Sequence, residues 1–215
     1  MLSLVLVIIN KFFDLLNTFM YAIQCRRQGI TKHAEVLITG PRNAGKTTLA
    51  HRLRAGSTRV QMNWKSGICT HQPLLPPQQP PTNVDLTAHL DHNSTRFTIT
   101  EPGGLAAPPI FGFLRSANAL IFMVDGSDYE TISEARIMLD ATLARKEIEG
   151  VPVVVFVNKI DRHHAVGPEE FMYLMGFADG GLDCMRRERA VEVLFGSIVV
   201  EQGIEHMIAW LAEHV

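Results

Sequence analysis

The positions of the apolar residues divide most of the chain into two kinds of segment. From residue 34 onward, runs of consecutive apolar residues alternate with longer segments in which apolar residues recur every three or four positions. The runs predict buried strands, and the recurring pattern predicts helices with one apolar face. The predicted strands are 34–40, 117–125, 151–159 and 189–197, and the predicted helices are 46–54, 131–148, 168–175 and 203–214. This alternation predicts an α/β domain with a mostly parallel sheet and helices on both faces.

Two further segments have different patterns. Residues 84–90 and 95–101 alternate apolar and polar positions around an Asp-His-Asn-Ser turn, which predicts an antiparallel hairpin. Before this hairpin, the segment 57–81 contains "QPLLPPQQPP", and so many prolines can neither pair as a strand nor continue a helix. We expect 57–81 to be an extended or disordered surface insertion in a domain that covers 34–215.

The segment 1–23, "MLSLVLVIINKFFDLLNTFMYAI", is more apolar than the rest of the chain. On a helix, one narrow face is polar and the remaining surface consists of Leu, Val, Ile, Phe and Met. Such a helix is typical of proteins that lie in the membrane interface, and the basic residues that follow suit anionic headgroups. We expect 1–33 to be an amphipathic membrane-binding helix and linker. A transmembrane anchor and a helix packed on the domain's own core are the alternatives.

The composition is that of an ordinary globular protein, with 47% hydrophobic and 20% charged residues. The basic and acidic residues nearly cancel to a net charge of −2, so the charge does not favour nucleic acid as a partner. The three cysteines, Cys25, Cys69 and Cys184, lie far apart and lack the spacing of a metal site. They indicate a reducing compartment and not a disulfide framework.

The segment Gly-Pro-Arg-Asn-Ala-Gly-Lys-Thr, residues 40–47, follows a predicted buried strand and opens a predicted helix. It matches the pattern of a phosphate-binding loop, whose backbone N–H groups point at phosphate oxygens. The lysine of such a loop, here Lys46, reaches the β- and γ-phosphates, and the next hydroxyl, here Thr47, binds Mg²⁺. The predicted phosphate-binding residues in this loop are Gly40, Asn43, Ala44, Gly45, Lys46, Thr47 and Thr48.

A second motif, Asn158-Lys159-Ile160-Asp161, follows the predicted strand 151–159. The Asp161 carboxylate can accept hydrogen bonds from guanine N1–H and from the exocyclic amine, a pair of donors that adenine does not offer. Asn158 and the aliphatic stem of Lys159 can hold the ring and the loop. After a phosphate-binding loop, this motif at the carboxyl end of a parallel strand predicts a guanine-nucleotide site.

With these motifs the chain resembles the Arf and Arf-like branch of the Ras-type small GTPases over residues 34–214. The similar segments are "GKTTLAHRLRAG" (45–56), "ALIFMVDGSDYETISEARIML" (119–139), "NKIDRHHAVGPEEFMYLMGF" (158–177) and "GIEHMIAWL" (203–211). The resemblance implies a Ras-like P-loop NTPase fold with an interswitch hairpin, GTP or GDP and Mg²⁺ as ligands, and a monomer. It also implies exchange-factor and effector proteins as partners. The expected location is the cytoplasmic face of a Golgi, ER or lysosomal/endosomal membrane, where the protein is bound permanently or in exchange with the cytosol.

The segment "FTITEPGGL", residues 97–105, differs from the family's sequence at the positions on which GTP hydrolysis depends. In the family, an Asp-x-Gly-Gly-Gln segment binds Mg²⁺ through a water, senses the γ-phosphate with a glycine N–H and orients the attacking water with glutamine. The corresponding residues are Glu101, Gly103 or Gly104, and Leu105. We expect Gly104 to contact phosphate and Glu101 to approach Mg²⁺ through a water. Leu105 cannot orient water, so hydrolysis should be weak.

Two further positions follow from the resemblance. Ser197 and Ile198 replace the family's small-residue pair beside guanine, so we expect them at the base with an altered contact to guanine O6. Thr82 has the family's spacing from Glu101 and is the expected switch I ligand of Mg²⁺. Thr70 is a competing candidate, and a chain without any switch I threonine is the third possibility.

The sequence favours a GTP-binding, membrane-recruited switch of Arf-like type in vesicle or organelle trafficking, with slow or impaired hydrolysis. One alternative is a conventional small GTPase that uses a partner protein's catalytic groups in place of the missing glutamine. The other is a permanently anchored, non-hydrolysing subunit that resembles the β-subunit of the signal-recognition-particle receptor, which also lacks this glutamine.

Overall fold

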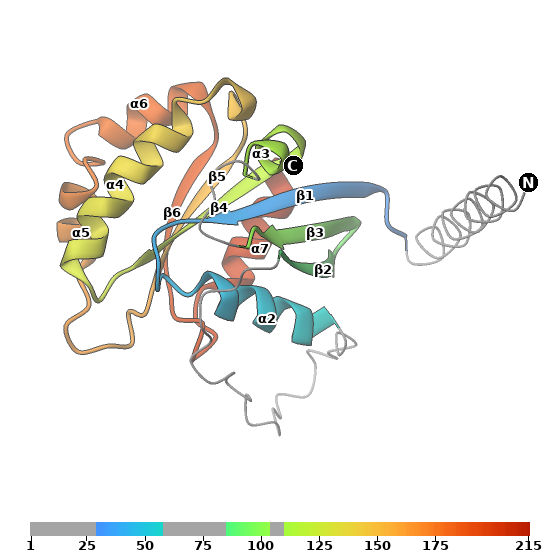
Figure 1. The fold of residues 1–215 in the computed structure, drawn as a ribbon, viewed down its shortest axis with the longest axis horizontal. Coiled ribbons are helices and arrows are strands. Elements are labelled where there is room, and N and C mark those ends of the chain that lie inside the picture. Colours follow the sequence, from blue (N-terminus) through green and yellow to red (C-terminus); the bar gives the residue numbers. More distant parts are fainter. Residues whose placement is uncertain (1–28, 58–84, 104–109) are drawn as a thin grey trace, which may run out of the picture.

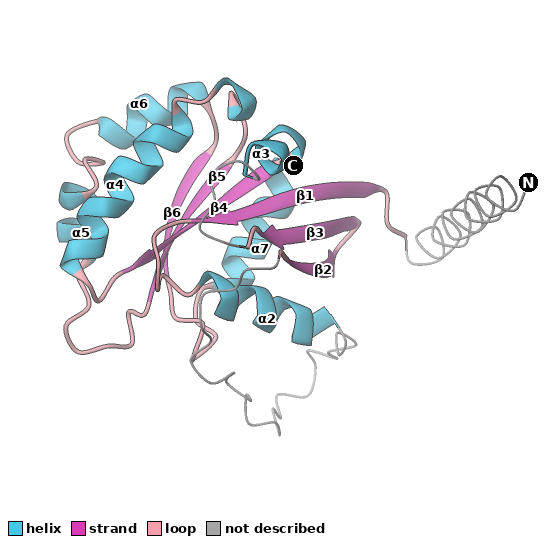
Figure 2. Ribbon diagram, in the orientation of Figure 1, coloured by secondary structure: helices cyan, strands magenta, loops and turns pink. Residues whose placement is uncertain are grey.

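The computed structural model describes residues 29–57, 85–103 and 110–215 (Figure 1). Its strands are β1 (Lys32–Thr39), β2 (Leu86–His92), β3 (Thr95–Glu101), β4 (Ala119–Asp125), β5 (Val153–Asn158) and β6 (Val191–Phe195). Its helices are α2 (Lys46–Ser57), α3 (Ile110–Ser116), α4 (Tyr129–Leu143), the 3-10 helix η1 (Lys146–Ile148), α5 (Pro168–Leu174), α6 (Gly181–Glu188) and α7 (Ile204–His214). Strands and helices alternate along the chain, as the sequence predicts (Figure 2).

The strands form one sheet in the order β2-β3-β1-β4-β5-β6. Neighbouring strands are parallel except β2 and β3, which form an antiparallel hairpin. The predicted mostly parallel sheet with one antiparallel hairpin is therefore confirmed. Because the strand order differs from the chain order, residues far apart in the sequence meet at the carboxyl edge of the sheet.

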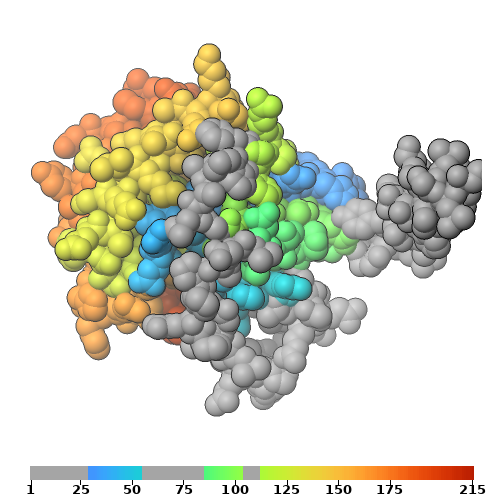
Figure 3. All heavy atoms as spheres, viewed as in Figure 1, coloured from blue at the N-terminus to red at the C-terminus, as the bar shows by residue number. Residues whose placement is uncertain are grey.

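Helices cover both faces of the sheet, and alternate side chains of β1 enter two separate cores. Val36 and Ile38 belong to the core that α2 and α7 cover. Leu37 belongs to the opposite core, which α3, α4, α5 and α6 cover. Figure 1 shows α2 and α7 on one side of the sheet and α4, α5 and α6 on the other, and Figure 3 shows α4 at the surface of its face. Every residue of β4 and β5 is buried, as expected for central strands of a sheet covered on both faces.

Two short helices have no counterpart among the predicted elements. Gly112 interrupts the sequence of α3, and α6 buries only Leu182 among its residues. Neither segment is long enough to develop the sustained apolar periodicity from which a helix is predicted. The predicted helix 131–148 is also divided, because α4 ends at Leu143 and η1 follows it.

The hairpin turn is tighter than the predicted four-residue turn. Strand β2 continues to His92 and β3 begins at Thr95, so only Asn93 and Ser94 connect them. Asn93 has a φ of 53°, a left-handed conformation that asparagine tolerates better than most residues. The turn therefore draws two residues of the predicted loop into the strand pair.

Several predictions concern residues outside the described ranges. The amphipathic helix 1–23 lies there, as does the insertion 57–81 apart from Ser57, which ends α2. Both stay predictions. Strand β1 begins at Lys32, two residues before the predicted start of the domain at residue 34. Across residues 29–57, 85–103 and 110–215, no helix has the length and apolar character needed to cross a bilayer.

Candidate functional site

The carboxyl ends of the parallel strands bring the predicted site residues to one edge of the sheet. Strand β1 leads into the phosphate loop (residues 40–47), β3 ends at Glu101 and β5 ends at Asn158. Asp125, the last residue of β4, lies opposite Asn158 in the strand register. In open α/β sheets this edge is where ligands bind.

The phosphate loop requires glycine at two positions. Gly40 has a φ of 133°, and a Cβ added there would lie 2.1 Å from the Met123 carbonyl oxygen of β4. Gly45 has a φ of 98°, and a Cβ added there would lie 2.4 Å from Nδ2 of Asn158. Any other residue would be strained at these φ angles and would collide with β4 or β5. The loop therefore approaches the sheet as closely as its backbone allows.

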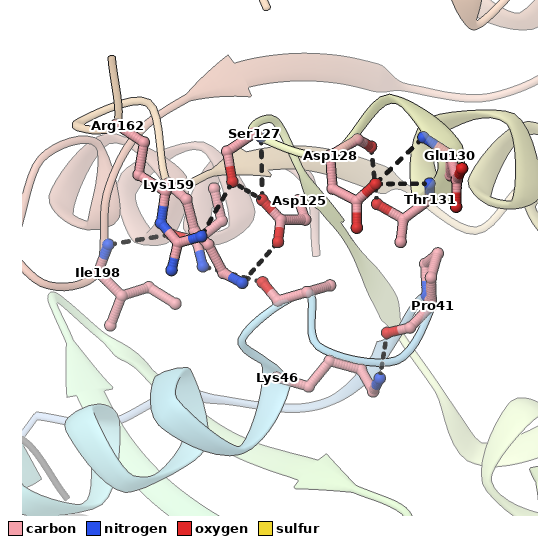
Figure 4. Close-up of polar contacts among 12 residues, drawn as sticks. Pro41, Lys46, Asp125, Ser127, Asp128, Glu130, Thr131, Lys159, Arg162 and Ile198 are labelled. Carbon is pink, nitrogen blue, oxygen red and sulfur yellow. Dashed lines mark hydrogen bonds and ion pairs between the residues drawn. The ribbon is translucent and has the colours of Figure 1, made fainter. Parts of the chain in front are cut away.

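Lys46, the first residue of α2, folds back over this loop. Its Nζ donates a hydrogen bond to the Gly40 carbonyl at 2.9 Å. It donates another to the Pro41 carbonyl at 2.6 Å (Figure 4). Burial lowers the pKa of Lys46 below its ordinary value, and the nearby Glu101 carboxylate opposes this shift. The ammonium is thus held over the loop, where it could exchange these carbonyls for phosphate oxygens.

Thr47 and Glu101 meet at the predicted Mg²⁺ position. Thr47 Oγ1 donates a hydrogen bond to Glu101 Oε1 at 2.9 Å. Glu101 is 4% exposed, and its second oxygen, Oε2, is buried with no hydrogen-bond partner in the described part of the chain. Burial raises the pKa of Glu101, although the Thr47 hydrogen bond and the Lys46 charge act in the opposite direction. A buried, incompletely paired carboxylate beside a hydroxyl is a suitable set of oxygen donors for Mg²⁺, so the residues present fit this ion.

Asn158 connects the phosphate loop to the loop that follows β6. Its Nδ2 donates to the Ala44 carbonyl at 2.9 Å, and its Oδ1 accepts from the Ile198 N–H at 3.1 Å. Both hydrogen bonds are buried. The amide therefore fixes the two loops relative to each other, a role that the motif alone does not distinguish from contact with the base.

Lys159 is held by Asp125, a residue that no motif assigns to the site. Lys159 Nζ donates to Asp125 Oδ2 at 2.5 Å, and Asp125 Oδ1 accepts from the Ser127 N–H at 2.9 Å and from its hydroxyl at 2.6 Å (Figure 4). Arg162 Nη1 extends this network to the Ser127 hydroxyl at 3.4 Å. Burial acts to raise the pKa of Asp125, but the hydrogen bonds from Lys159 and Ser127 outweigh it and hold the pKa below its usual value.

One signal in the sequence could have identified Asp125. It ends the continuous apolar run 119–125, and it is 1% exposed. A charged residue at the end of a fully buried strand requires a partner of opposite charge. The partner is not identifiable from the sequence, because Lys159 follows β5, which is distant in the chain but pairs with β4 in the sheet.

The remaining predicted base-binding residues lie in two adjacent loops. Asp161 is exposed in the turn after β5, whereas Ser197 and Ile198 are buried after β6. The Ile160 N–H donates to the Gly196 carbonyl at 3.3 Å, which places these loops side by side. The Ile198 N–H is bonded to Asn158, and the Ser197 hydroxyl has no partner among the described residues.

Thr82, Gly104 and Leu105 lie outside the described residues, as does the competing Thr70, so their roles stay predictions. The described residues that border these segments are in contact: the Gly103 N–H donates to Asp85 Oδ1 at 2.8 Å.

Comparison with known families decides the class of the protein. The sequence model of the ADP-ribosylation factor family matches residues 75–215, well over half of the chain. The chain belongs to the ADP-ribosylation factor family. This confirms the resemblance inferred from the motifs, and the ligand class for a member of the family is a guanine nucleotide.

Individual relatives match over most of the length of both chains. The small COPII coat GTPase SAR1 of Giardia intestinalis is 25% identical over 191 residues, which are 86% of this chain and 91% of the relative. The human ADP-ribosylation factor-like protein 16 is 28% identical over 188 residues, or 87% and 89% of the two chains. ADP-ribosylation factor-like protein 1 of Saccharomyces cerevisiae is 24% identical over 187 residues, or 86% and 89%.

Proposed function

We propose that this protein is a GTP-binding switch that is recruited to intracellular membranes and hydrolyses GTP slowly or not at all. The observation that carries the proposal is a pair of buried hydrogen bonds at Asn158, which donates to the Ala44 carbonyl and accepts from the Ile198 N–H. Through them a phosphate-binding loop and the predicted base-binding loops share one edge of the sheet, where one nucleotide can contact both. The family match supports guanine as the base.

At the phosphate end, the chain's own groups bind and neutralise charge. Lys46 Nζ would leave the carbonyls of Gly40 and Pro41 for the β- and γ-phosphate oxygens, while backbone N–H groups of the loop bind the remaining oxygens. Thr47 and Glu101 would hold Mg²⁺. The ion would neutralise charge on the bound phosphates.

At the base end, the Asp125–Lys159 ion pair holds the lysine stem, along which a flat ring can pack. The exposed Asp161 carboxylate is then available to the two donors of guanine. In this proposal Asp125 positions Lys159 and Asp161 binds the base, which explains why the Asp125 carboxylate is buried and paired while the Asp161 carboxylate faces solvent.

The assignment of guanine is tested by Asp161→Asn. Loss of two hydrogen bonds to a charged acceptor, each worth about 1.5–3 kcal/mol, should weaken GDP binding by roughly 10²- to 10⁴-fold. The asparagine amide can donate to the C2 carbonyl of xanthine, so the variant should gain affinity for xanthosine diphosphate. Asp183→Asn, which changes an exposed aspartate of α6, is the matched control and should bind GDP as wild type does. Wild-type binding of ADP as tight as that of GDP in calorimetry would contradict the assignment.

Slow hydrolysis is inferred from Leu105. Unassisted turnover should lie below the rate of roughly 10⁻⁴ s⁻¹ that is typical of a small GTPase with its glutamine. Leu105→Gln should raise the single-turnover rate because the amide can orient the attacking water. If wild type already hydrolyses GTP as fast as the glutamine variant, the inference from Leu105 is wrong.

Membrane recruitment is inferred from the amphipathic pattern of residues 1–23. A trafficking role is supported by the relatives, one of which is named as a COPII coat GTPase. We expect the nucleotide state to select exchange-factor and effector proteins on the cytoplasmic face of the membrane. Carbonate extraction of membranes should release the protein, because an interfacial helix does not cross the bilayer. Retention after extraction would favour a permanently anchored subunit that resembles the signal-recognition-particle receptor β-subunit.

A further inference from the structure

The side chain of Glu101 is placed to do more than approach Mg²⁺ through a water. We infer that Glu101 binds Mg²⁺ directly through its carboxylate, next to Thr47, and thereby replaces one water of the ion. This inference rests on the proposed nucleotide site but concerns how the metal is bound there.

The spacing of the two oxygens suits direct binding. Mg²⁺ binds oxygen ligands at about 2.0–2.1 Å in octahedral geometry, so two adjacent ligands lie about 2.9 Å apart. Thr47 Oγ1 and Glu101 Oε1 are 2.9 Å apart. The two atoms can therefore occupy neighbouring positions around one ion without movement of β3 or α2.

The length of the side chain also favours direct binding. A carboxylate that binds through a water lies about 4 Å from the ion, whereas a direct ligand lies about 2.1 Å away. Glutamate extends its carboxylate by one more C–C bond than aspartate, about 1.5 Å. At the end of β3, this extension covers most of the difference between the two modes.

One oxygen of the Glu101 carboxylate lacks a partner in the described part of the chain. Oε2 is buried with no hydrogen-bond partner among the described residues, although the rest of the carboxyl group contacts Thr47. An incompletely paired buried carboxylate is costly, and a divalent cation bound to it removes that cost. An aspartate would be long enough to accept a hydrogen bond from a metal-bound water, so that role does not require the extra methylene of Glu101.

The number of water molecules bound to the metal distinguishes direct binding by Glu101 from binding through a water. Mn²⁺ replaces Mg²⁺ in the GDP complex, and ¹⁷O-water broadening of its electron paramagnetic resonance signal counts the bound waters. With Thr47, Glu101 and one phosphate oxygen as ligands, water should fill about half of the octahedral positions. Glu101→Asp should bind one water more than wild type, and Glu101→Gln should weaken Mn²⁺ affinity at least about tenfold.

Glu134→Gln is the matched control for charge. Glu134 is exposed on α4 and its charge acts on Lys46 without a hydrogen bond to Thr47, so this variant should keep the wild-type water count and Mn²⁺ affinity. A wild-type complex with about two thirds of its positions filled by water, or a Glu101→Asp variant with the same count as wild type, would overturn the inference. GDP binding is measured separately by calorimetry with Mg²⁺ present. Failure to bind GDP there would contradict the proposed function, whereas GDP binding with a high water count would contradict only direct metal binding.

Discussion

Replacement of Asn158 by alanine should uncouple the phosphate loop from the loop that follows β6. The substitution removes the donor to the Ala44 carbonyl and the acceptor for the Ile198 N–H, and both groups are buried against β5. Each buried group left without a partner costs about 1–3 kcal/mol, so we expect a loss of about 2–6 kcal/mol in the free energy of unfolding. The free energy of unfolding of a domain is only about 5–15 kcal/mol in total, so this loss is a large share of the stability.

Urea unfolding followed by circular dichroism, with EDTA and no nucleotide, measures this loss directly. With a slope of about 2 kcal/mol per molar urea, the midpoint should fall by about 1–3 M. The affinity for GDP should also fall, at least about tenfold, because the phosphate loop is no longer fixed relative to the loop after β6. Asn158→Asp should be comparably damaging, since it places a carboxylate oxygen against the Ala44 carbonyl.

Asn118→Ala is the control for this prediction. Asn118 Oδ1 accepts a hydrogen bond from the Glu35 N–H at 2.8 Å, but at an exposed position where water can replace it. The control should therefore cost only about 0.5–1.5 kcal/mol and leave GDP binding unchanged. If Asn158→Ala costs no more than Asn118→Ala, the buried amide does not hold the loops together and the reasoning is refuted.

Three further predictions concern neighbouring residues. Gly45→Ala should abolish GDP binding in calorimetry, because its Cβ would collide with Asn158. Gly112→Ala, where the added Cβ meets no atom of the described residues within 4 Å, should instead stabilise α3 by about 0.5–1 kcal/mol in urea unfolding. Lys46→Ala should also abolish GDP binding while far-UV circular dichroism stays unchanged, and retained affinity would argue against the phosphate assignment. Asp125→Asn should lower stability at neutral pH, because the carboxylate of wild type pairs with Lys159. The pKa of Asp125 is lowered in the folded state, so its contribution to the free energy of unfolding is present above the ordinary pKa of about 4 and is lost as pH falls through the folded pKa. A stability difference between wild type and variant that grows in acid would contradict this.

The class of the protein and most of the sheet could be predicted because their signals are local. The phosphate loop is contiguous, and its glycines and lysine act through the backbone of one turn. The buried strands appear as continuous apolar runs because both faces of the sheet are covered. Helices α3 and α6 were not predictable in the same way, because they are too short to show a period.

Which side chains pair within the site was decided by the tertiary structure. Lys159 meets Asp125, and Thr47 meets Glu101, although the members of each pair are 34 and 54 residues apart in the chain. Such pairs are decided by strand order and register, which align β4 with β5 and bring β3 beside β1. A motif names the residue types that bind a nucleotide, but the partner of a buried charge is determined by which strands become neighbours. The sequence alone therefore determined the family, the loop and the missing glutamine, while only the fold decided that the Glu101 carboxylate lies within hydrogen-bonding distance of the Thr47 hydroxyl.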